Sequence, residues 1–152
     1  KSIKITPLFT GGGQELELRP STLNTPAIVG FAKASELFTP EKIQTMKELK
    51  NYFIQEVIKI KGTKINTSLT HALPNIINVF FSNTDADSLL LKLYEKGIAV
   101  STGSACTSFK KSTSHVLKAL GIKANASLRF SFSLYTTMQE VQTTLKVLKE
   151  IV

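Results

Sequence analysis

The chain has 152 residues, of which 42% are hydrophobic and 20% charged, a balance typical of one globular domain with its own core. No apolar run approaches the roughly 18 residues that a membrane helix needs, and no signal segment opens the chain. One cysteine and two histidines allow neither an intrachain disulfide nor a metal cluster, so we expect no metal site. They also favour a reducing compartment, the cytoplasm or alternatively the mitochondrial matrix. The net charge of +8 would suit an acidic partner, but the lysines are dispersed without interleaved aromatics, so we expect neither nucleic acid nor membrane as a partner.

The first 38 residues contain two predicted elements separated by a glycine loop. Residues 1–9 alternate apolar and polar side chains, which predicts a short strand that stops near Pro7. Three consecutive glycines, Gly11 to Gly13, then predict a loop, because glycine loses the most conformational entropy inside an element. Apolar residues predict a helix between Thr22 and Phe38.

A long helix is predicted from Thr39-Pro40-Glu41 to Gly62. It begins with a capping hydroxyl, a proline in the first turn and an acidic side chain near the positive helix end. Its apolar residues recur at spacings of three and four and form one stripe. These residues are Ile43, Met46, Leu49, Phe53, Val57 and Ile60.

The following segment alternates short strands with helices. Strands are predicted over residues 64–67, 76–82 and 98–100, and a short helix over residues 113–120, before Gly121. Thr84-x-x-Asp87 resembles a capping box that begins another helix, with Gly97 just past its end.

Residues 127–133 show the clearest strand alternation. Leu128, Phe130 and Phe132 share one face, and Ser127, Arg129, Ser131 and Ser133 share the other. Thr137-x-x-Glu140 predicts the start of a last helix, whose apolar stripe is Met138, Val141, Leu145, Leu148 and Val152. Together these elements predict an α/β fold, a small sheet covered by helices.

Cys106 lies in a segment of small and polar residues, with no large apolar side chain to bury a thiol. A lone cysteine is commonly a buried small hydrophobe, which is the structural alternative. However, the segment follows a predicted buried strand, where α/β folds place reactive loops, and Lys110 and Lys111 downstream would favour the thiolate. Because no histidine flanks it, this thiol suits group transfer better than acyl hydrolysis.

Arg129 is the second candidate, at the centre of an alternating strand on its serine-lined face. Two interpretations remain open on this pattern alone. The arginine is either a solvent-facing charge on a half-exposed sheet or a rigidly mounted guanidinium that holds a carboxylate in bidentate fashion.

Several motifs form a set that runs nearly from end to end of the chain. They are Gly11-Gly12-Gly13-Gln14-Glu15, Arg19, Thr22-Leu23-Asn24, Pro26-Ala27-Ile28-Val29-Gly30, Pro74-Asn75-Ile76-Ile77-Asn78-Val79, Ser101-Thr102-Gly103-Ser104-Ala105-Cys106-Thr107-Ser108, Val116-Leu117-Lys118-Ala119-Leu120-Gly121 and Arg129-Phe130-Ser131. In this order they resemble a signature of the cysteine desulfurases, and the cysteine loop resembles the NifS/IscS-like class.

The resemblance implies a fold-type-I enzyme that depends on pyridoxal 5'-phosphate and is normally a homodimer. Members take sulfur from L-cysteine, release alanine and leave a persulfide on the loop cysteine. By matching position, Cys106 would be the catalytic nucleophile, Arg129 would bind the substrate carboxylate, and Thr22 would reach across the dimer to the partner's cofactor phosphate. The sulfur acceptor would be an iron–sulfur scaffold or a tRNA-thiolation protein.

Two departures from the family pattern fall near the cofactor phosphate. The family usually has Arg-Gly after Gln-Glu, where this chain has Leu16-Glu17, and Arg-Ser-Gly-Thr where this chain has Arg19-Pro20-Ser21-Thr22. Losing a cation near a phosphate is electrostatically unfavourable, and losing a glycine could shift the loop that presents Thr22. We expect the phosphate contact across the dimer to be weakened.

The resemblance covers only the carboxyl-terminal portion of such an enzyme. Residues 1–36 would be the tail of the large cofactor domain, and residues 37–152 the small C-terminal domain with the cysteine loop. The family's cofactor lysine would precede Lys1, so we expect a fragment that is inactive alone. One alternative is a non-catalytic sulfur-carrier or protein-interaction module of the same fold. Another is a basic nucleic-acid-binding domain, whose affinity for nucleic acid would have to fall steeply with salt; we expect no such binding.

Overall fold

The computed structural model describes residues 3–82, 84–102, 115–122 and 126–152. The chain divides into two units, Lys1–Leu37 and Phe38–Val152, each with its own internal contacts. In the first unit, helix α1 (Thr25–Glu36) begins where the Asn24 side chain accepts a hydrogen bond from the Ala27 backbone N–H at 3.1 Å. No residue of α1 is buried by this chain, although most of its side chains are apolar.

The strand predicted over residues 1–9 is wrong for the part that the structure describes, because residues 3–9 form no strand. Ile3, Ile5 and Leu8 are 87%, 66% and 92% exposed. Alternation alone does not make a strand, since a strand needs a neighbour that accepts and donates its backbone hydrogen bonds. No strand is assigned among the described residues of the first unit.

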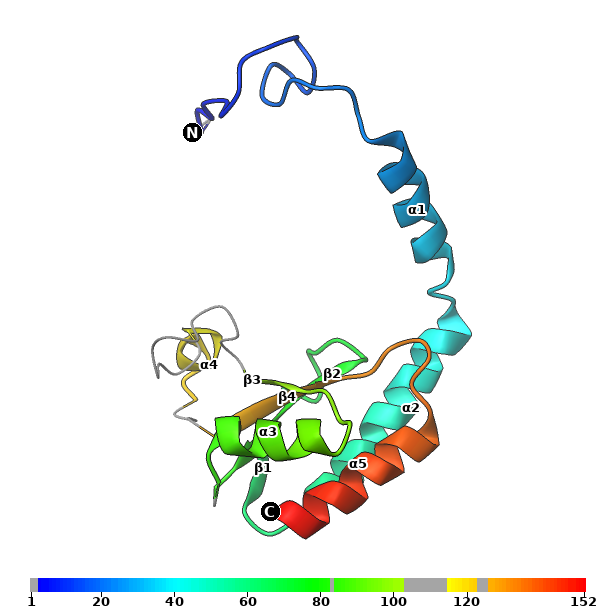
Figure 1. Cartoon of the computed structure of the whole chain (residues 1–152), viewed down its shortest axis with the longest axis vertical. Helices are drawn as coiled ribbons and strands as arrows, with labels where there is room; N and C mark the ends of the chain where they lie inside the picture. The colour runs from blue at the N-terminus through cyan, green and yellow to red at the C-terminus, as the bar shows by residue number, and fades with distance from the viewer. Residues whose placement is uncertain (1–2, 83, 103–114, 123–125) are drawn as a thin grey trace. The chain divides into compact units, whose positions relative to one another are not determined.

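The second unit is built on a four-stranded sheet in the order β1-β2-β4-β3 (Figure 1). The strands are β1 (Thr63–Ile65), β2 (Ile76–Phe81), β3 (Ser101–Thr102) and β4 (Ser127–Ser131). Every neighbouring pair is antiparallel. The two central strands, β2 and β4, carry the longest register, from Ile76 opposite Ser131 to Phe80 opposite Ser127.

Three helices pack on one face of this sheet: α2 (Pro40–Val57), α3 (Ala86–Glu95) and α5 (Met138–Ile151) (Figure 1). The core between them contains the predicted stripes of α2 and α5 and alternate residues of β2 and β4. At its centre the ring of Phe53 lies 4.8 Å from that of Phe130 and 5.8 Å from that of Phe132. The burial of Leu128, Phe130 and Phe132 confirms the face predicted for the last strand.

Helix boundaries follow local hydrogen bonds. The capping box of α5 is confirmed, since Thr137 Oγ1 accepts from the Glu140 N–H at 3.3 Å and Glu140 Oε2 from the Thr137 N–H at 2.7 Å. The box predicted at Thr84 is wrong by one residue. Asp85 is the cap of α3, and its carboxylate accepts from the Ser88 N–H at 3.1 Å.

The strand predicted over residues 98–100 is wrong in its bounds: β3 begins three residues later, at Ser101. The end of α3 explains the difference, because Gly97 has a φ of +75° and the Ile98 N–H donates to the Leu93 carbonyl at 2.9 Å. This 6→1 hydrogen bond is that of a Schellman motif, so Ile98 still belongs to the helix end. The short helix α4 (His115–Ala119) ends in the same way at Gly121.

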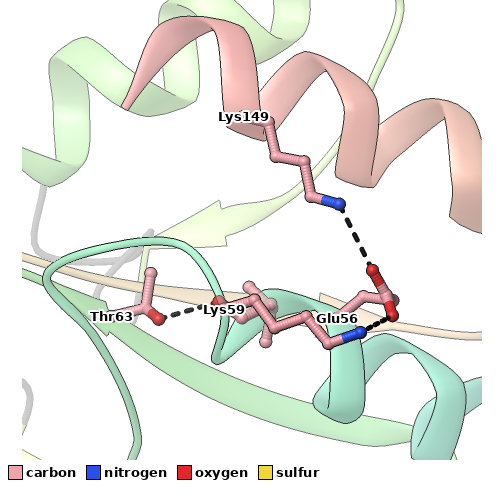
Figure 2. A network of polar contacts seen from close by, with 5 residues as sticks. Glu56, Lys59, Thr63 and Lys149 are labelled. Atoms are coloured by element: carbon pink, nitrogen blue, oxygen red, sulfur yellow. Dashed lines mark hydrogen bonds and ion pairs between the residues drawn. The ribbon is translucent and has the colours of Figure 1, made fainter.

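A charged network joins α2 to α5 beside the core. Figure 2 shows Glu56 between two lysines: it pairs with Lys59 one turn later and accepts from Lys149 Nζ of α5 at 3.2 Å. Thr63, at the start of β1, donates to the Ile60 carbonyl at 2.8 Å. Both lysines lower the pKa of the Glu56 carboxyl, chiefly through their hydrogen bonds.

Candidate functional site

The face of the sheet opposite the helices carries a row of polar residues. Arg129 of β4 lies directly opposite Asn78 of β2 on one side and Ser101 of β3 on the other. Directly opposed residues of an antiparallel pair project from the same face. The three side chains therefore share the open face, while the neighbours of Arg129 along β4, Leu128 and Phe130, are buried against the helices.

The guanidinium of Arg129 is available for a ligand. The side chain is exposed, and within the part of the chain that the structure describes it has neither a hydrogen-bond acceptor nor an acidic partner. Its backbone is fixed by strands on both sides. A planar guanidinium on a rigid strand suits bidentate binding of a carboxylate.

A hydrogen-bonded cluster beside Arg129 was not predicted from the sequence. Asn66 Nδ2 donates to Asn78 Oδ1 at 2.7 Å and to Ser127 Oγ at 3.0 Å. The Asn78 N–H donates to Thr67 Oγ1 at 2.7 Å. The available signal was that Asn78 interrupts an apolar strand at a position alternate to buried Ile77 and Val79, but its partners depend on the strand register.

Cys106 lies outside the described residues, as do Lys110 and Lys111. The chain enters that segment from β3, whose residues pair with β4: Ser101 opposite Arg129 and Thr102 opposite Leu128. The described part of the sheet thus ends, on this side, next to the predicted carboxylate-binding residue.

Thr22 lies in the first unit, in an open hollow of about 750 Å³. Arg19, Ser21 and Asn24 line the same hollow, and so does the carboxylate-bearing Glu15. The loop closes on itself next to this hollow, because a Cβ at Gly11 would lie 2.8 Å from the Pro20 Cβ.

The departures at Leu16 and Glu17 fall on a left-handed turn. Glu15, Leu16 and Glu17 have φ values of +51°, +57° and +64°, and the Glu17 N–H donates to the Gln14 carbonyl at 3.1 Å. Left-handed backbone costs a non-glycine residue roughly 1–2 kcal/mol. A glycine at position 17 would adopt this conformation without that cost.

Comparison with known proteins agrees with this arrangement. Residues 8–144 match the family model described as Aminotransferase class-V. The chain belongs to the aminotransferase class-V family. This confirms the fold class predicted above, a small sheet with helices of the kind found in fold-type-I enzymes.

Within the aminotransferase class-V family, proteins similar to this chain include cysteine desulfurases. The chain is 42% identical to the cysteine desulfurase IscS of Dictyoglomus turgidum and 42% identical to that of Methanosarcina thermophila, and covers 40% and 39% of them. A solved structure of a NifS-like protein from Rickettsia africae is 31% identical with a TM-score of 0.81, over 98% of this chain and 40% of that one. The chain thus spans about 40% of the length of its curated relatives, and the resemblance inferred from its motifs is confirmed.

The residues of the first unit partly fit the phosphate of a class-V cofactor. Thr22 and Ser21 supply hydroxyls, Arg19 supplies a cation, and the first turn of α1 contains no acidic residue. Hydroxyls, a guanidinium and a helix N-terminus are the groups that bind phosphate. The Glu15 carboxylate lines the same hollow, but it belongs to the motif that matches the family and is not one of the two departures.

Two further findings concern the described residues alone. None of their helices combines the length and apolar character needed to cross a membrane. They also contain no cluster of three or more histidine, cysteine, aspartate or glutamate side chains able to hold a metal ion.

Proposed function

We propose that this chain is the carboxyl-terminal part of a pyridoxal 5'-phosphate-dependent cysteine desulfurase, and that Arg129 binds the carboxylate of L-cysteine. The observation that carries the proposal is the exposed guanidinium of Arg129, fixed between two strands without an acidic partner among the described residues. The similarity to cysteine desulfurases over the whole chain supports it.

Cys106 is the proposed sulfur acceptor. In the sequence it follows Thr102, the last residue of β3, by four positions, and β3 is the strand that pairs with β4 beside Arg129. The thiolate attacks the sulfur of the bound L-cysteine: a sulfur–sulfur bond forms, the carbon–sulfur bond breaks, and the electron pair leaves with the carbon. That carbon takes up a proton to give L-alanine, and Cys106 holds the sulfur as a persulfide.

Pyridoxal phosphate, when bound, supplies an electron sink for the substrate carbon. Its lysine lies outside this chain, and this chain alone is therefore inactive in our proposal. Thr22 would hold the phosphate of a partner subunit's cofactor in a homodimer. Residues 1–36 would belong to the large cofactor domain and residues 37–152 to the small domain, in a cytoplasmic or mitochondrial protein that passes sulfur to an iron–sulfur scaffold or a tRNA-thiolation protein.

A second candidate function is a non-catalytic sulfur carrier or protein-interaction module of the same fold. One observation favours it: Leu16 and Glu17 stand where the family usually has Arg-Gly, both hold left-handed backbone, and position 16, beside the hollow that contains Thr22, carries no cation. In a module that binds no cofactor, selection would not act against these substitutions.

The test is to measure the alanine and sulfide that the full-length protein releases from L-cysteine, with Cys106→Ser and Arg129→Ala beside the wild type. We expect Cys106→Ser to abolish sulfide release while cofactor absorbance is retained. Arg129→Ala should raise the KM for L-cysteine about 100-fold, since it removes a bidentate charged contact. A wild type that binds cofactor but releases no alanine would favour the non-catalytic function.

A further inference from the structure

Asn78 is held in place more firmly than a strand residue requires. Its backbone carbonyl accepts from the Asn66 N–H at 2.9 Å, its backbone N–H donates to Thr67 Oγ1 at 2.7 Å, and its side-chain oxygen accepts from Asn66 Nδ2 at 2.7 Å. The second hydrogen of Asn66 Nδ2 is used by Ser127 Oγ at 3.0 Å. Because both hydrogens of Asn66 Nδ2 are engaged, the oxygen of the Asn78 amide is the end that faces Asn66.

The amide nitrogen of Asn78 is left over. Within the described residues it has no acceptor, although the side chain is half-buried on the open face of the sheet. In a planar amide the nitrogen lies on the other side of Cγ from the oxygen, so it is directed away from Asn66. Asn78 also lies directly opposite Arg129, whose guanidinium has donors only and no partner among the described residues.

We infer that Asn78 is a second carboxylate-binding residue beside Arg129, and that Asn66 is the positioning residue that keeps the Asn78 amide nitrogen turned toward the ligand. This inference rests on the proposed function and extends it to two residues. A carboxylate has two oxygens with about four acceptor positions, more than one guanidinium edge occupies. A fixed neutral donor next to Arg129 fills a further acceptor position of the carboxylate. Because it is uncharged, it neither neutralises nor repels the arginine.

Isosteric substitutions separate this role from a structural one. Asn78→Asp keeps the acceptor that Asn66 needs but replaces the donor by a negative oxygen next to Arg129. Asn66→Asp has no hydrogen to donate to Asn78. The Asn78 amide is then expected to flip, so that its nitrogen donates to the new carboxylate and its oxygen is presented to the ligand. The Ser127 hydroxyl can still donate to the carboxylate at position 66. Asn51→Asp is the matched control, because it makes the same change of charge on the exposed side of α2.

The experiment measures the KM and kcat of alanine release from L-cysteine in the full-length holoenzyme, together with the melting temperature of each variant. Loss of a hydrogen bond to a charged group predicts a KM about 10- to 100-fold higher for Asn78→Asp and about 10-fold higher for Asn66→Asp. We expect kcat at saturating substrate to stay within about 2-fold and Asn51→Asp to match the wild type. A KM within about 2-fold of wild type for Asn78→Asp would overturn the inference, as would equal losses in kcat and melting temperature without a change in KM.

Calorimetric titration with L-alanine distinguishes a failure of this inference from a failure of the proposed function. If the wild type releases no alanine from L-cysteine but binds L-alanine, and Asn78→Asp weakens that binding about 10-fold or more, the carboxylate contact stands and the desulfurase function falls. Equal binding by the two proteins, or no binding by the wild type, would overturn the contact itself. Should Asn78→Asp fail to fold, the KM of Asn66→Asp decides in the same way.

Discussion

Removal of the Phe53 ring should destabilise the second unit more than any single truncation at its surface. Phe53 is 1% exposed, and its ring lies against the rings of Phe130 and Phe132. Phe130 directly follows Arg129 in the chain and is buried on the opposite face of the sheet. Truncating a buried phenylalanine to alanine costs about 3–5 kcal/mol, and each aromatic pair adds about 0.5–1.5 kcal/mol beyond burial. We expect Phe53→Ala to lower the free energy of unfolding by about 4–5 kcal/mol, roughly a quarter or more of the 5–15 kcal/mol of a typical domain.

Urea unfolding followed by circular dichroism measures this loss, and two variants frame it. Phe53→Leu keeps most of the volume but loses both ring contacts, so it should cost about 1–2 kcal/mol. Phe31→Ala makes the same truncation on α1, where the ring is 78% exposed in this chain, and should change stability by less than about 0.5 kcal/mol. A cost below about 2 kcal/mol for Phe53→Ala, or equal costs for Phe53→Ala and Phe31→Ala, would refute the packing described for the core.

Three further substitutions test local features of the second unit. Thr137→Ala removes the capping box of α5 and should cost about 1 kcal/mol in urea unfolding, whereas no loss would mean that Glu140 caps the helix without it. Gly97→Ala should cost about 1–2 kcal/mol, because φ is +75° while an added Cβ meets no atom within 4 Å; a neutral result would argue against the left-handed helix end. Lys59 and Lys149 lower the pKa of Glu56 below 4.5, so the stability it contributes is present above that pH and is lost as the pH falls through the lowered pKa. The urea midpoints of wild type and Glu56→Gln should therefore differ at pH 7 and converge as the pH falls through that lowered pKa, and a constant difference would contradict the ion pairs.

The sequence alone determined the elements whose signals are local. The start of α2 at Thr39-Pro40 and the capping box of α5 depend on side chains within one helical turn, and both are found where predicted. The faces of β4 follow from alternation, because a period of two separates core from open face without knowledge of the partner strand. For the same reason Arg129 could be assigned to the open face before its neighbours were known.

Only the tertiary structure decided which residues meet across the chain. The alternating residues 3–9 found no strand to pair with, and Asn66 reaches Ser127 across 61 positions of sequence. Lys50 of α2 is only 6% exposed, and its Nζ donates to the Leu73 carbonyl at 2.8 Å. Burial lowers the pKa of this lysine. Local patterns fix propensity and face, whereas register and long-range hydrogen bonds depend on the summed packing of every element, which no single segment encodes.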